Sequence, residues 1–424
     1  MAKPKLALIP SGVADNQVFS VLPSNGDGDF NFTRGTVATR VNAQGLIETV
    51  SNDLPRLNYP LLDGVVQECP SLLLENSATN LITYSEDFSN TVWNNSNEVI
   101  RTANATISPD GSLNAFDIKP TNINANHTLR AQNLGGFTSG AVVNVSFFAK
   151  QNGYKYISIV GGFGSSNTPS VIFNLEDGLI QSGTGTIENY ENGWYRCIVP
   201  ITLNSTALYC VGTILNDNLL GSFIGDNVKG IYVYGFQVEQ GNLSSYIPTN
   251  GSATTRLAET CNGAGTSDTF NDSEGVLMAE ISALVNNSDT KRISLSDGTS
   301  SNRISLYLSN ETIGGVIVSG GSVGFSTSVS GYDATLNNKI LFKYKENDFS
   351  IFVNGFEILT DTSGATPIGL NELRFDNGYS GNDFYGKTKQ IQYYDSALTD
   401  SELEQLTSWV SFQEMAQSQL YTIQ

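Results

Sequence analysis

The chain has 424 residues, which at about 100 to 200 residues per domain predicts two or three domains, each able to bury a core. Its 22 Lys and Arg against 41 Asp and Glu give a formal net charge of -19, the wrong sign for binding nucleic acid phosphates or an anionic membrane surface. The sequence has no run of about 18 apolar residues that would predict membrane insertion, and MAKPKLALIPSG lacks the apolar core of a secretory signal.

The composition is typical of β-sandwiches. Gly is abundant at 41 residues, and 18 Tyr and 21 Phe accompany many Ser, Thr and Asn, as expected for short strands joined by tight turns. The four cysteines show no C-x-x-C spacing, so we expect free or buried thiols at Cys69, Cys197, Cys210 and Cys261. The sequence therefore predicts an all-β protein.

Residues 1–80 form the first predicted unit, an extended N-terminal segment. Its clearest element is a hairpin between Val37–Val41 and Leu46–Val50, in which Gly45 supplies the positive φ of a short loop. The segment has too little apolar content to stand alone. We therefore expect it to dock on a partner or on the following domain.

Residues 81–256 are predicted to form a jelly-roll sandwich. Its β-rich stretches are bounded by Gly, Asn or Asp, as in SVIFNLEDG (Ser170–Gly178). In GIYVYGFQVE, alternation places Tyr232, Tyr234, Phe236 and Val238 on one face and Ile231 and Val233 on the other. Because both faces are apolar, this stretch is predicted to be an inner strand.

Residues 257–273 are predicted to be a linker, because Thr, Gly, Ser, Asn and Asp predominate there. Residues 274–398 repeat the strand pattern and are predicted to form a second sandwich, in which Asn354-Gly355 is a strong hairpin signal.

Residues 399–424 are predicted to hold a short C-terminal helix and a tail. Thr399 and Glu402 have the spacing of a capping box. Leu403, Leu406 and Val410 share a helical face that would pack on the sandwich, a subunit contact being the alternative.

Four stretches resemble the sequences of tailed-bacteriophage fibre and spike proteins. They are FTRGTVATRVNAQGLIE (Phe32–Glu48), CPSLLLENSATNLITYSEDFSNTVWN (Cys69–Asn94), GFQVEQGNLSSYIPTNGSATTR (Gly235–Arg256) and FYGKTKQIQYYDSALTDSELEQL (Phe384–Leu406). Their order resembles a virion-attachment segment, a carbohydrate-binding-module-like jelly roll and a laminin-G or concanavalin A-like lectin domain.

This resemblance implies a virion appendage, a head or tail fibre attached by its N-terminal segment to other virion proteins. The protein would be made in the cytoplasm of a host bacterium and displayed on the virion surface as a homo-oligomer, a trimer in most similar fibres. Its sandwiches would bind host or environmental glycans weakly and multivalently. Function inferred from fold in this way is an analogy.

Sugar rings stack on flat aromatic side chains, which makes Tyr154, Tyr156, Tyr232 and Tyr234 candidate binding platforms. The alternative for each is a ring that fills a sandwich interior. Trp194 lies mid-strand, and both it and Trp93 are predicted to be packing residues.

Catalytic and metal signals are weak. Glucan hydrolases of the concanavalin A-like fold carry E-x-D-x-x-E, but after Glu346 and Asp348 the second Glu is replaced by Ile351. His127, the one histidine, follows a polar stretch and is predicted to lie in a loop or at the surface. No cofactor is expected, apart from a structural Ca²⁺ for which the candidate ligands are Asp272 with Glu274 and Asp297 with Asn302.

The leading hypothesis is thus a non-enzymatic, glycan-binding virion appendage. One alternative is a capsid or connector decoration protein without a ligand, in which the aromatic residues serve cores and subunit contacts. A second alternative is a polysaccharide-degrading glycosidase. Solvent-open aromatic faces in a concave groove would favour binding over decoration.

Overall fold

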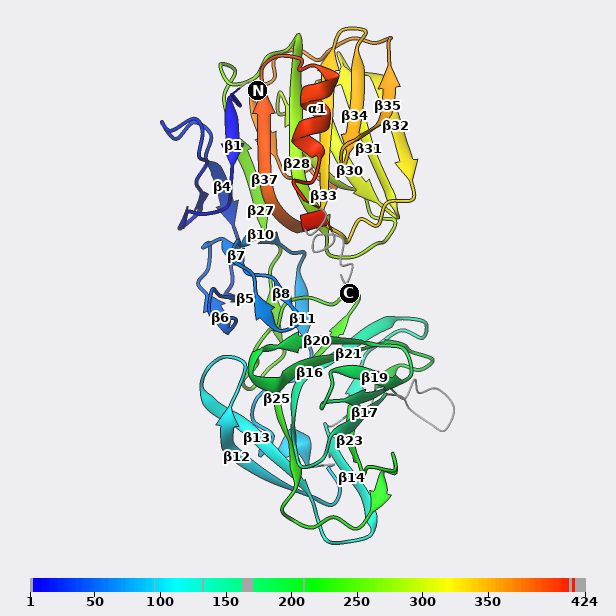
Figure 1. Ribbon diagram of the computed structural model, residues 1–424. Coiled ribbons are helices and arrows are strands. Elements are labelled where there is room, and N and C mark those ends of the chain that lie inside the picture. Colours follow the sequence, from blue (N-terminus) through cyan, green and yellow to red (C-terminus); the bar gives the residue numbers. More distant parts are fainter. Residues whose placement is uncertain are drawn as a thin grey trace.

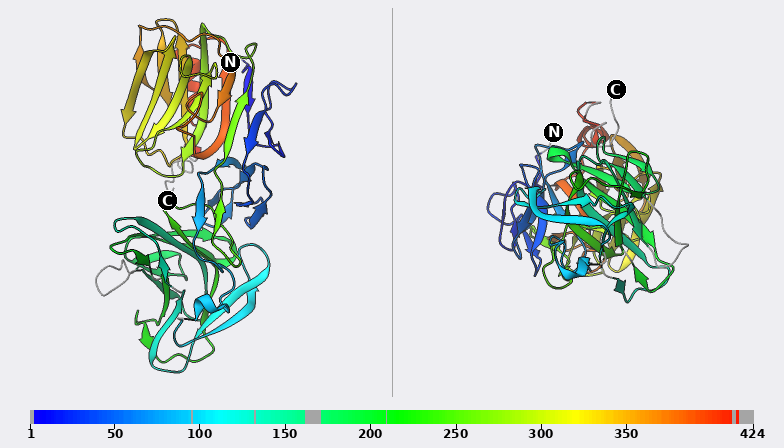
Figure 2. Two further views of the ribbon diagram at one scale, coloured as in Figure 1. Left: turned by 180° about the vertical axis from the view of Figure 1, so that it is seen from behind. Right: turned by 90° about the horizontal axis from the view of Figure 1, so that it is seen from below.

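A computed structural model describes residues 3–94, 96–131, 133–161, 171–208, 210–411 and 414–415, without the side chains of residues 160, 161, 210 and 211. Two β-sandwiches are stacked end to end, and much of the N-terminal segment lies at the waist between them (Figures 1 and 2). The predicted all-β class is confirmed. A search of the described residues for a helix long and apolar enough to span a membrane returns nothing.

The C-terminal sandwich has two sheets that face each other across one large apolar core. The first sheet has the order β35 (Phe356–Asp361), β34 (Phe349–Val353), β33 (Asn338–Lys345), β28 (Glu274–Ala283), β37 (Gly386–Tyr394), β10 (Ser71–Leu74) and β7 (Arg56–Asn58), with β1 (Leu6–Leu8) also paired to β37. The second has the order β2 (Val13–Ala14), β3 (Gln17–Val18), β4 (Phe30–Thr33), β27 (Thr260–Ala264), β36 (Glu372–Arg374), β29 (Lys291–Ser296), β30 (Arg303–Ser309), β31 (Thr312–Ser319) and β32 (Ser322–Ser330).

The N-terminal segment, predicted to be extended and to dock on a partner or on the following domain, contributes strands to this C-terminal sandwich. Strands β1 and β10 both pair with β37, and β4 pairs with β27. Residues 257–273, predicted to be a linker, are also part of this sandwich. They contain β27, an inner strand between β4 and β36. The apolar residues of β27 are small, Cys261 and Ala264, so the strand carries little hydropathy signal although both are buried.

The central sandwich, residues 81–256, also has two sheets around its own core. One has the order β12 (Val99–Ile107), β13 (Leu113–Pro120), β25 (Gly230–Gln240), β16 (Val142–Asn152), β21 (Trp194–Thr202) and β20 (Thr186–Tyr190). The other has the order β19 (Leu179–Ser182), β18 (Val171–Asn174), β17 (Tyr156–Gly161), β23 (Cys210–Leu215), β14 (Ala125–Arg130) and β24 (Ser222–Phe223).

Short pairs and turns complete the fold. They are β5 (Ala38–Val41) with β6 (Ile47–Val50), β8 (Leu61–Leu62) with β9 (Val65–Val66), β11 (Ala78–Asn80) with β26 (Thr254–Arg256), β15 (Leu134–Gly135) with β22 (Ala207–Leu208), and the 3₁₀ turns η1 (Thr91–Trp93) and η2 (Glu191–Gly193). The hairpins predicted around Gly45 and at Asn354-Gly355 are both confirmed.

Strand β25 is an inner strand, as predicted, but its alternation is interrupted. A bulge at Gly235 and Phe236 faces Phe147 of β16, because Ser146 pairs with Gln237 while Phe148 pairs with Tyr234. The extra residue turns Phe236 and Val238 into the sandwich core with Ile231 and Val233. The prediction that Phe236 and Val238 share the face of Tyr232 and Tyr234 was therefore wrong.

Helix α1 (Asp400–Thr407) is the predicted C-terminal helix. The backbone N–H and the hydroxyl of Thr399 both donate to the carboxylate of Glu402, at 3.1 and 2.9 Å. Leu403 is buried against the sandwich and Leu406 packs beside it. Val410 does not extend this face, because the helix ends at Thr407 and leaves Val410 91% exposed. Residues 412–413 and 416–424 of the predicted tail lie outside the described residues.

The structure confirms the prediction for the two tryptophans and contradicts the prediction for His127. Trp93 and Trp194 are packing residues, and their indole N–H groups donate to the carbonyls of Tyr84 and Ile107 at 3.0 Å. His127, predicted for a loop or surface, instead lies fully buried in β14. Its ring nitrogens lie 2.6 Å from the carbonyl oxygen of Glu98 and 2.8 Å from that of Phe223. Strand alternation directs it inward despite its polar sequence neighbours.

The described cysteine side chains are free, as expected. Cys69 is exposed, whereas Cys197 and Cys261 are buried, and burial raises the pKa of both buried thiols. The side chain of Cys210 lies outside the described part of the structure.

Candidate functional site

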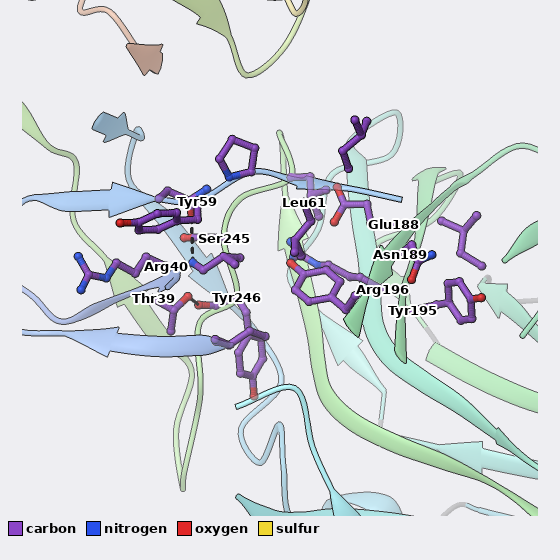
Figure 3. A pocket seen from close by; sticks show the side chains of 18 of the residues that line it. Thr39, Arg40, Tyr59, Leu61, Glu188, Asn189, Tyr195, Arg196, Ser245 and Tyr246 are labelled. Atoms are coloured by element: carbon purple, nitrogen blue, oxygen red, sulfur yellow. Dashed lines mark hydrogen bonds between the residues drawn. The ribbon is translucent and has the colours of Figure 1, made fainter. Parts of the chain in front are cut away.

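A polar groove of about 590 Å³ opens at the waist, and we call it the waist groove. It lies between the N-terminal segment, the β20–β21 edge of the central sandwich and the loop before β26. Figure 3 shows Arg40 and Tyr59 on one side of the groove, Asn189 and Tyr195 on the other, and Arg196 between them. Its volume is within the range of about 300 to 1,000 Å³ that is common for ligand sites.

Three tyrosines, Tyr59, Tyr190 and Tyr195, supply partly exposed aromatic surface to the waist groove. Tyr190 is held edge-on against Phe148, with ring centroids 5.1 Å apart. Burial and the charge of Asp177 raise the pKa of Tyr195, and burial raises that of Tyr190. The hydroxyls of Tyr190 and Tyr195 therefore stay protonated at neutral pH and can donate hydrogen bonds.

Polar side chains surround these rings. Arg40 forms a 3.0 Å ion pair with the carboxylate of Glu48. Arg196 donates through Nη2 to the carbonyl of Ser244 at 2.9 Å, while its buried Nε has no hydrogen-bond partner. Asn58 and Asn189 add amide groups. Mixed donors and acceptors beside aromatic surface suit a ligand rich in hydroxyl groups.

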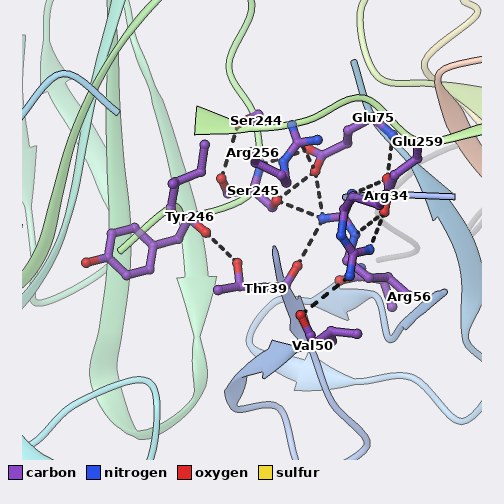
Figure 4. Close-up of polar contacts among 12 residues, drawn as sticks. Arg34, Thr39, Val50, Arg56, Glu75, Ser244, Ser245, Tyr246, Arg256 and Glu259 are labelled. Carbon is purple, nitrogen blue, oxygen red and sulfur yellow. Dashed lines mark hydrogen bonds and ion pairs between the residues drawn. The ribbon is translucent and has the colours of Figure 1, made fainter. Parts of the chain in front are cut away.

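Glu75, which lines the waist groove, belongs to a buried ionic network, defined as Arg34, Arg56, Glu75, Arg256 and Glu259 (Figure 4). Glu259 accepts from Nη1 of Arg34 at 2.7 Å and from Nε of Arg56 at 2.9 Å. Glu75 pairs with Nη1 of Arg56 at 2.7 Å and with Nη2 of Arg256 at 3.4 Å. No member is more than 4% exposed.

The network favours the charged forms of Glu75 and Arg56. Burial alone would raise the pKa of Glu75, but the charges of Arg56 and Arg256 and hydrogen bonds from Ser245 outweigh it and lower the pKa to about 2. Burial would lower the pKa of Arg56, but Glu259 and Glu75 outweigh that effect and raise it. These ion pairs connect residues that precede the central sandwich in the chain to residues that follow it. They therefore stabilise the waist, where the chain enters and leaves the central sandwich.

The four tyrosines proposed from the sequence do not line the waist groove. Tyr154 lies just before β17 and Tyr156 at its start, and both are half-buried. The ammonium group of Lys155 lies over the ring of Tyr156, 5.4 Å from the ring centroid. Tyr232 is half-buried on β25. Tyr234 is 2% exposed and its hydroxyl lies 2.9 Å from a carboxylate oxygen of Glu86, so its ring is interior.

The proposed calcium ligands are already engaged by the protein. The carboxylate of Asp272 accepts backbone N–H groups at 2.7 and 2.9 Å, and Glu274 pairs with Lys345 at 2.9 Å. Asp297 accepts from the backbone N–H of Thr299 at 2.8 Å and from the amide of Asn302 at 2.9 Å. Across the described ranges, a search for three or more gathered His, Cys, Asp or Glu side chains finds no group.

Asp348, Asp177 and Glu75, three acidic residues near the candidate sites, also have structural partners. Asp348, from the incomplete hydrolase motif, pairs with Lys343 at 2.7 Å. In the waist groove, Asp177 accepts from the amide of Asn174 at 2.8 Å, and Glu75 belongs to the ionic network. Sequence reasoning missed the groove, although three of its lining residues, Arg40, Glu75 and Ser245, lie in the stretches that resemble phage fibres.

Comparison with known proteins gives similarities to parts of solved structures. No protein-family model matches the chain. No curated protein matches it either. The CBM40 module of a Ruminococcus gnavus sialidase bound to α2,3-sialyllactose is 20% identical over 34% of this chain and 88% of that module, with a TM-score of 0.30. Domain 4 of a Geobacillus stearothermophilus GH43 arabinanase, in complex with arabinotriose, is 14% identical over 40% of this chain and 82% of that domain, with a TM-score of 0.28. Likenesses of this extent assign no ligand to this chain.

Proposed function

We propose that the chain binds a glycan in the waist groove without cleaving it, as part of a bacteriophage virion appendage. The observation that carries glycan binding is the gathering of Tyr59, Tyr190 and Tyr195 with charged and amide side chains in one groove of about 590 Å³. A hydrophobic pocket for an apolar ligand would lack this density of polar groups.

In this proposal a sugar ring lies with its apolar C–H face against Tyr59 or Tyr195. Its hydroxyls are met by Arg40, Asn58 and Asn189, which all line the waist groove.

The virion role is supported by the resemblance of the four stretches to phage fibre proteins. The N-terminal segment exposes five large apolar side chains, which suit a contact with another virion protein: Ile9, Phe19, Val21, Val37 and Val65. In this proposal the chain is a homotrimer on the virion surface, after synthesis in the host cytoplasm. Linked sites raise avidity by about 10² to 10⁴.

A glycan array probed with the purified chain tests the binding proposal. We expect Tyr195→Ala and Tyr59→Ala each to lower the affinity for the bound glycan about tenfold, the loss of one stacked ring. Tyr156→Ala serves as the matched control, because Tyr156 lies outside the groove on β17. A loss in Tyr156→Ala alone would place the site on the sequence-proposed tyrosines instead.

The glycan array and an assay for reducing-end release distinguish the binding proposal from the decoration and glycosidase alternatives. The absence of binding to any host polysaccharide or whole cell would leave only the decoration role. Release of reducing ends from host capsule would revive the glycosidase. The virion role is tested by labelling purified phage particles with antibody against the chain, and failure to detect it there would end that part of the proposal.

A further inference from the structure

A second polar and aromatic cluster lies on the C-terminal sandwich, outside the waist groove. We call Arg292, Arg303, Tyr307 and Tyr379 the arginine–tyrosine patch. In β29, Ile293 and Leu295 point into the core, so the alternating Arg292 and Ser294 face outward. On the paired strand β30, Tyr307 lies opposite Arg292.

Each guanidinium in the patch lies over an aromatic ring. The central carbon of Arg292 is 5.3 Å from the ring centroid of Tyr307, and that of Arg303 is 5.5 Å from the centroid of Tyr379. Tyr379 is 41% exposed, so one ring of the patch remains open to solvent. Gly314 of β31 makes room for this arrangement, because a Cβ there would lie 2.5 Å from the ring of Tyr307.

Donors of both arginines are buried without a hydrogen-bond partner. These are Nε and Nη1 of Arg292 and Nε of Arg303, whereas Nη1 of Arg303 donates to the carbonyl oxygen of Ser300. In the part of the chain that the structure describes, neither arginine forms an ion pair within 4.0 Å. A buried charged donor without a partner is costlier than a neutral one, so the arrangement needs an explanation.

The neighbouring acidic side chains do not supply the missing partner. Asp376 is held by Arg374, with nitrogen–oxygen distances of 2.8 to 3.1 Å. Asp383 is hydrogen-bonded to Tyr385. The floor of the patch is also satisfied internally, because the hydroxyls of Ser294 and Ser305 lie 2.8 Å apart and Ser294 donates to the carbonyl of Asp376 at 2.6 Å.

The two arginines also affect each other. Burial lowers the pKa of Arg292, and the positive charge of Arg303 lowers it further. Two like charges thus lie close together without a counter-ion, in a chain whose net charge is -19. Among so many carboxylates, an uncompensated pair of guanidinium groups indicates a site for an anion from outside the chain.

We propose that the arginine–tyrosine patch binds the carboxylate or sulfate group of an acidic sugar, whose ring stacks on Tyr379. The guanidinium groups supply positive charge and N–H donors of the kind that an oxyanion accepts. The open tyrosine ring provides the flat surface that a pyranose needs. This site is separate from the waist groove and takes charged sugars, so it stands whether or not the groove binds a glycan.

The test is calorimetric titration of the full chain with trigalacturonate, with its neutral methyl ester as the matched ligand and sodium sulfate as the oxyanion alone. We expect trigalacturonate to bind at least tenfold more tightly than the ester. The double substitution R292Q/R303Q should lower its affinity at least tenfold. Tyr379→Ala should weaken trigalacturonate but leave sulfate binding unchanged, because sulfate has no ring.

Arg101→Gln is the matched control, since Arg101 is a half-buried arginine on β12, outside both the patch and the waist groove, and trigalacturonate affinity should not change. A measurement without variants guards against misfolding: sulfate should raise the melting temperature of the native chain more than chloride at equal ionic strength. Equal affinity for the acid and the ester, unchanged binding in R292Q/R303Q, or no saturable binding below about 10 mM would each overturn the proposal.

Discussion

At the scale of single residues, the waist is stabilised by charge instead of apolar packing. Arg34 and Arg56 both contact Glu259, and all three side chains are fully buried. Taking such ions out of water is costly, and only complete pairing with good hydrogen bonds offsets the cost. Removing one member therefore leaves its partners as buried, uncompensated charges.

We expect Glu259→Gln to lower the free energy of unfolding by about 3 to 5 kcal/mol, because it strips Arg34 and Arg56 of their shared carboxylate. Urea unfolding followed by circular dichroism measures the loss. Glu176→Gln is the control, since Glu176 pairs with Lys155 at the surface and should cost under about 1 kcal/mol. Equal effects of the two substitutions would contradict the role of the network.

The same network predicts a pH dependence. The pKa of Glu75 is about 2 in the folded chain against an ordinary value of 4.5, so the folded state favours the ionised carboxylate. The ionised carboxylate contributes about 3 kcal/mol to the free energy of unfolding. This contribution is complete above about pH 5 and is lost as the pH falls through about 2. The free energy of unfolding should therefore fall more steeply with acidification in the native chain than in Glu75→Gln. Parallel pH profiles would disprove the assignment.

The pKa of Glu86 shifts in the opposite direction, so its effect on the pH dependence of stability is also opposite. Burial raises its pKa despite hydrogen bonds from Tyr246 and Tyr234. Stability from this group is therefore complete below its unfolded pKa and is lost as the pH rises through its folded pKa. Glu86→Gln should flatten that part of the profile while keeping a polar group within reach of both tyrosines, and an unchanged profile would count against it.

At the scale of elements, the bulge in β25 sets which side chains reach the core. Gly235 has a φ of +60°, and a Cβ there would lie 3.0 Å from the ring of Phe148 and 3.1 Å from that of Tyr246. Gly235→Ala should therefore cost about 1 to 3 kcal/mol in unfolding free energy, measured in urea. Gly241→Ala is the control, because its φ is also positive but a Cβ would meet open space. A similar loss in both would mean that backbone strain alone decides.

The elements that local patterns encode could be predicted from the sequence. Hairpin turns at Gly45 and Asn354-Gly355 and the Thr399–Glu402 cap each depend on residues a few positions apart. The bulge at Gly235 and the burial of His127 could not, because both depend on strands that are distant in sequence. The waist groove was missed for the same reason, since Tyr59, Glu188 and Ser245 come from three separate segments.

At the scale of the whole molecule, the chain passes through the C-terminal sandwich twice. Strands β1, β4 and β10 come from residues 1–80, whereas β37 and β27, with which they pair, come from residues 257–398. The central sandwich draws the strands of both its sheets from residues 99–240. The two sandwiches therefore differ in how far each depends on the N-terminal segment.

This difference predicts the outcome of dividing the chain. Residues 81–256 alone should keep a cooperative β-sheet unfolding transition, because both of their sheets remain complete. Residues 257–424 alone should not, because β37 would lose β1 and β10, and β27 would lose β4, which exposes strand edges and the core. Co-expression with residues 1–80 should restore the transition, measured by circular dichroism on the purified complex. Cooperative unfolding of residues 257–424 alone, at the stability of the full chain, would show that the N-terminal segment is a detachable arm.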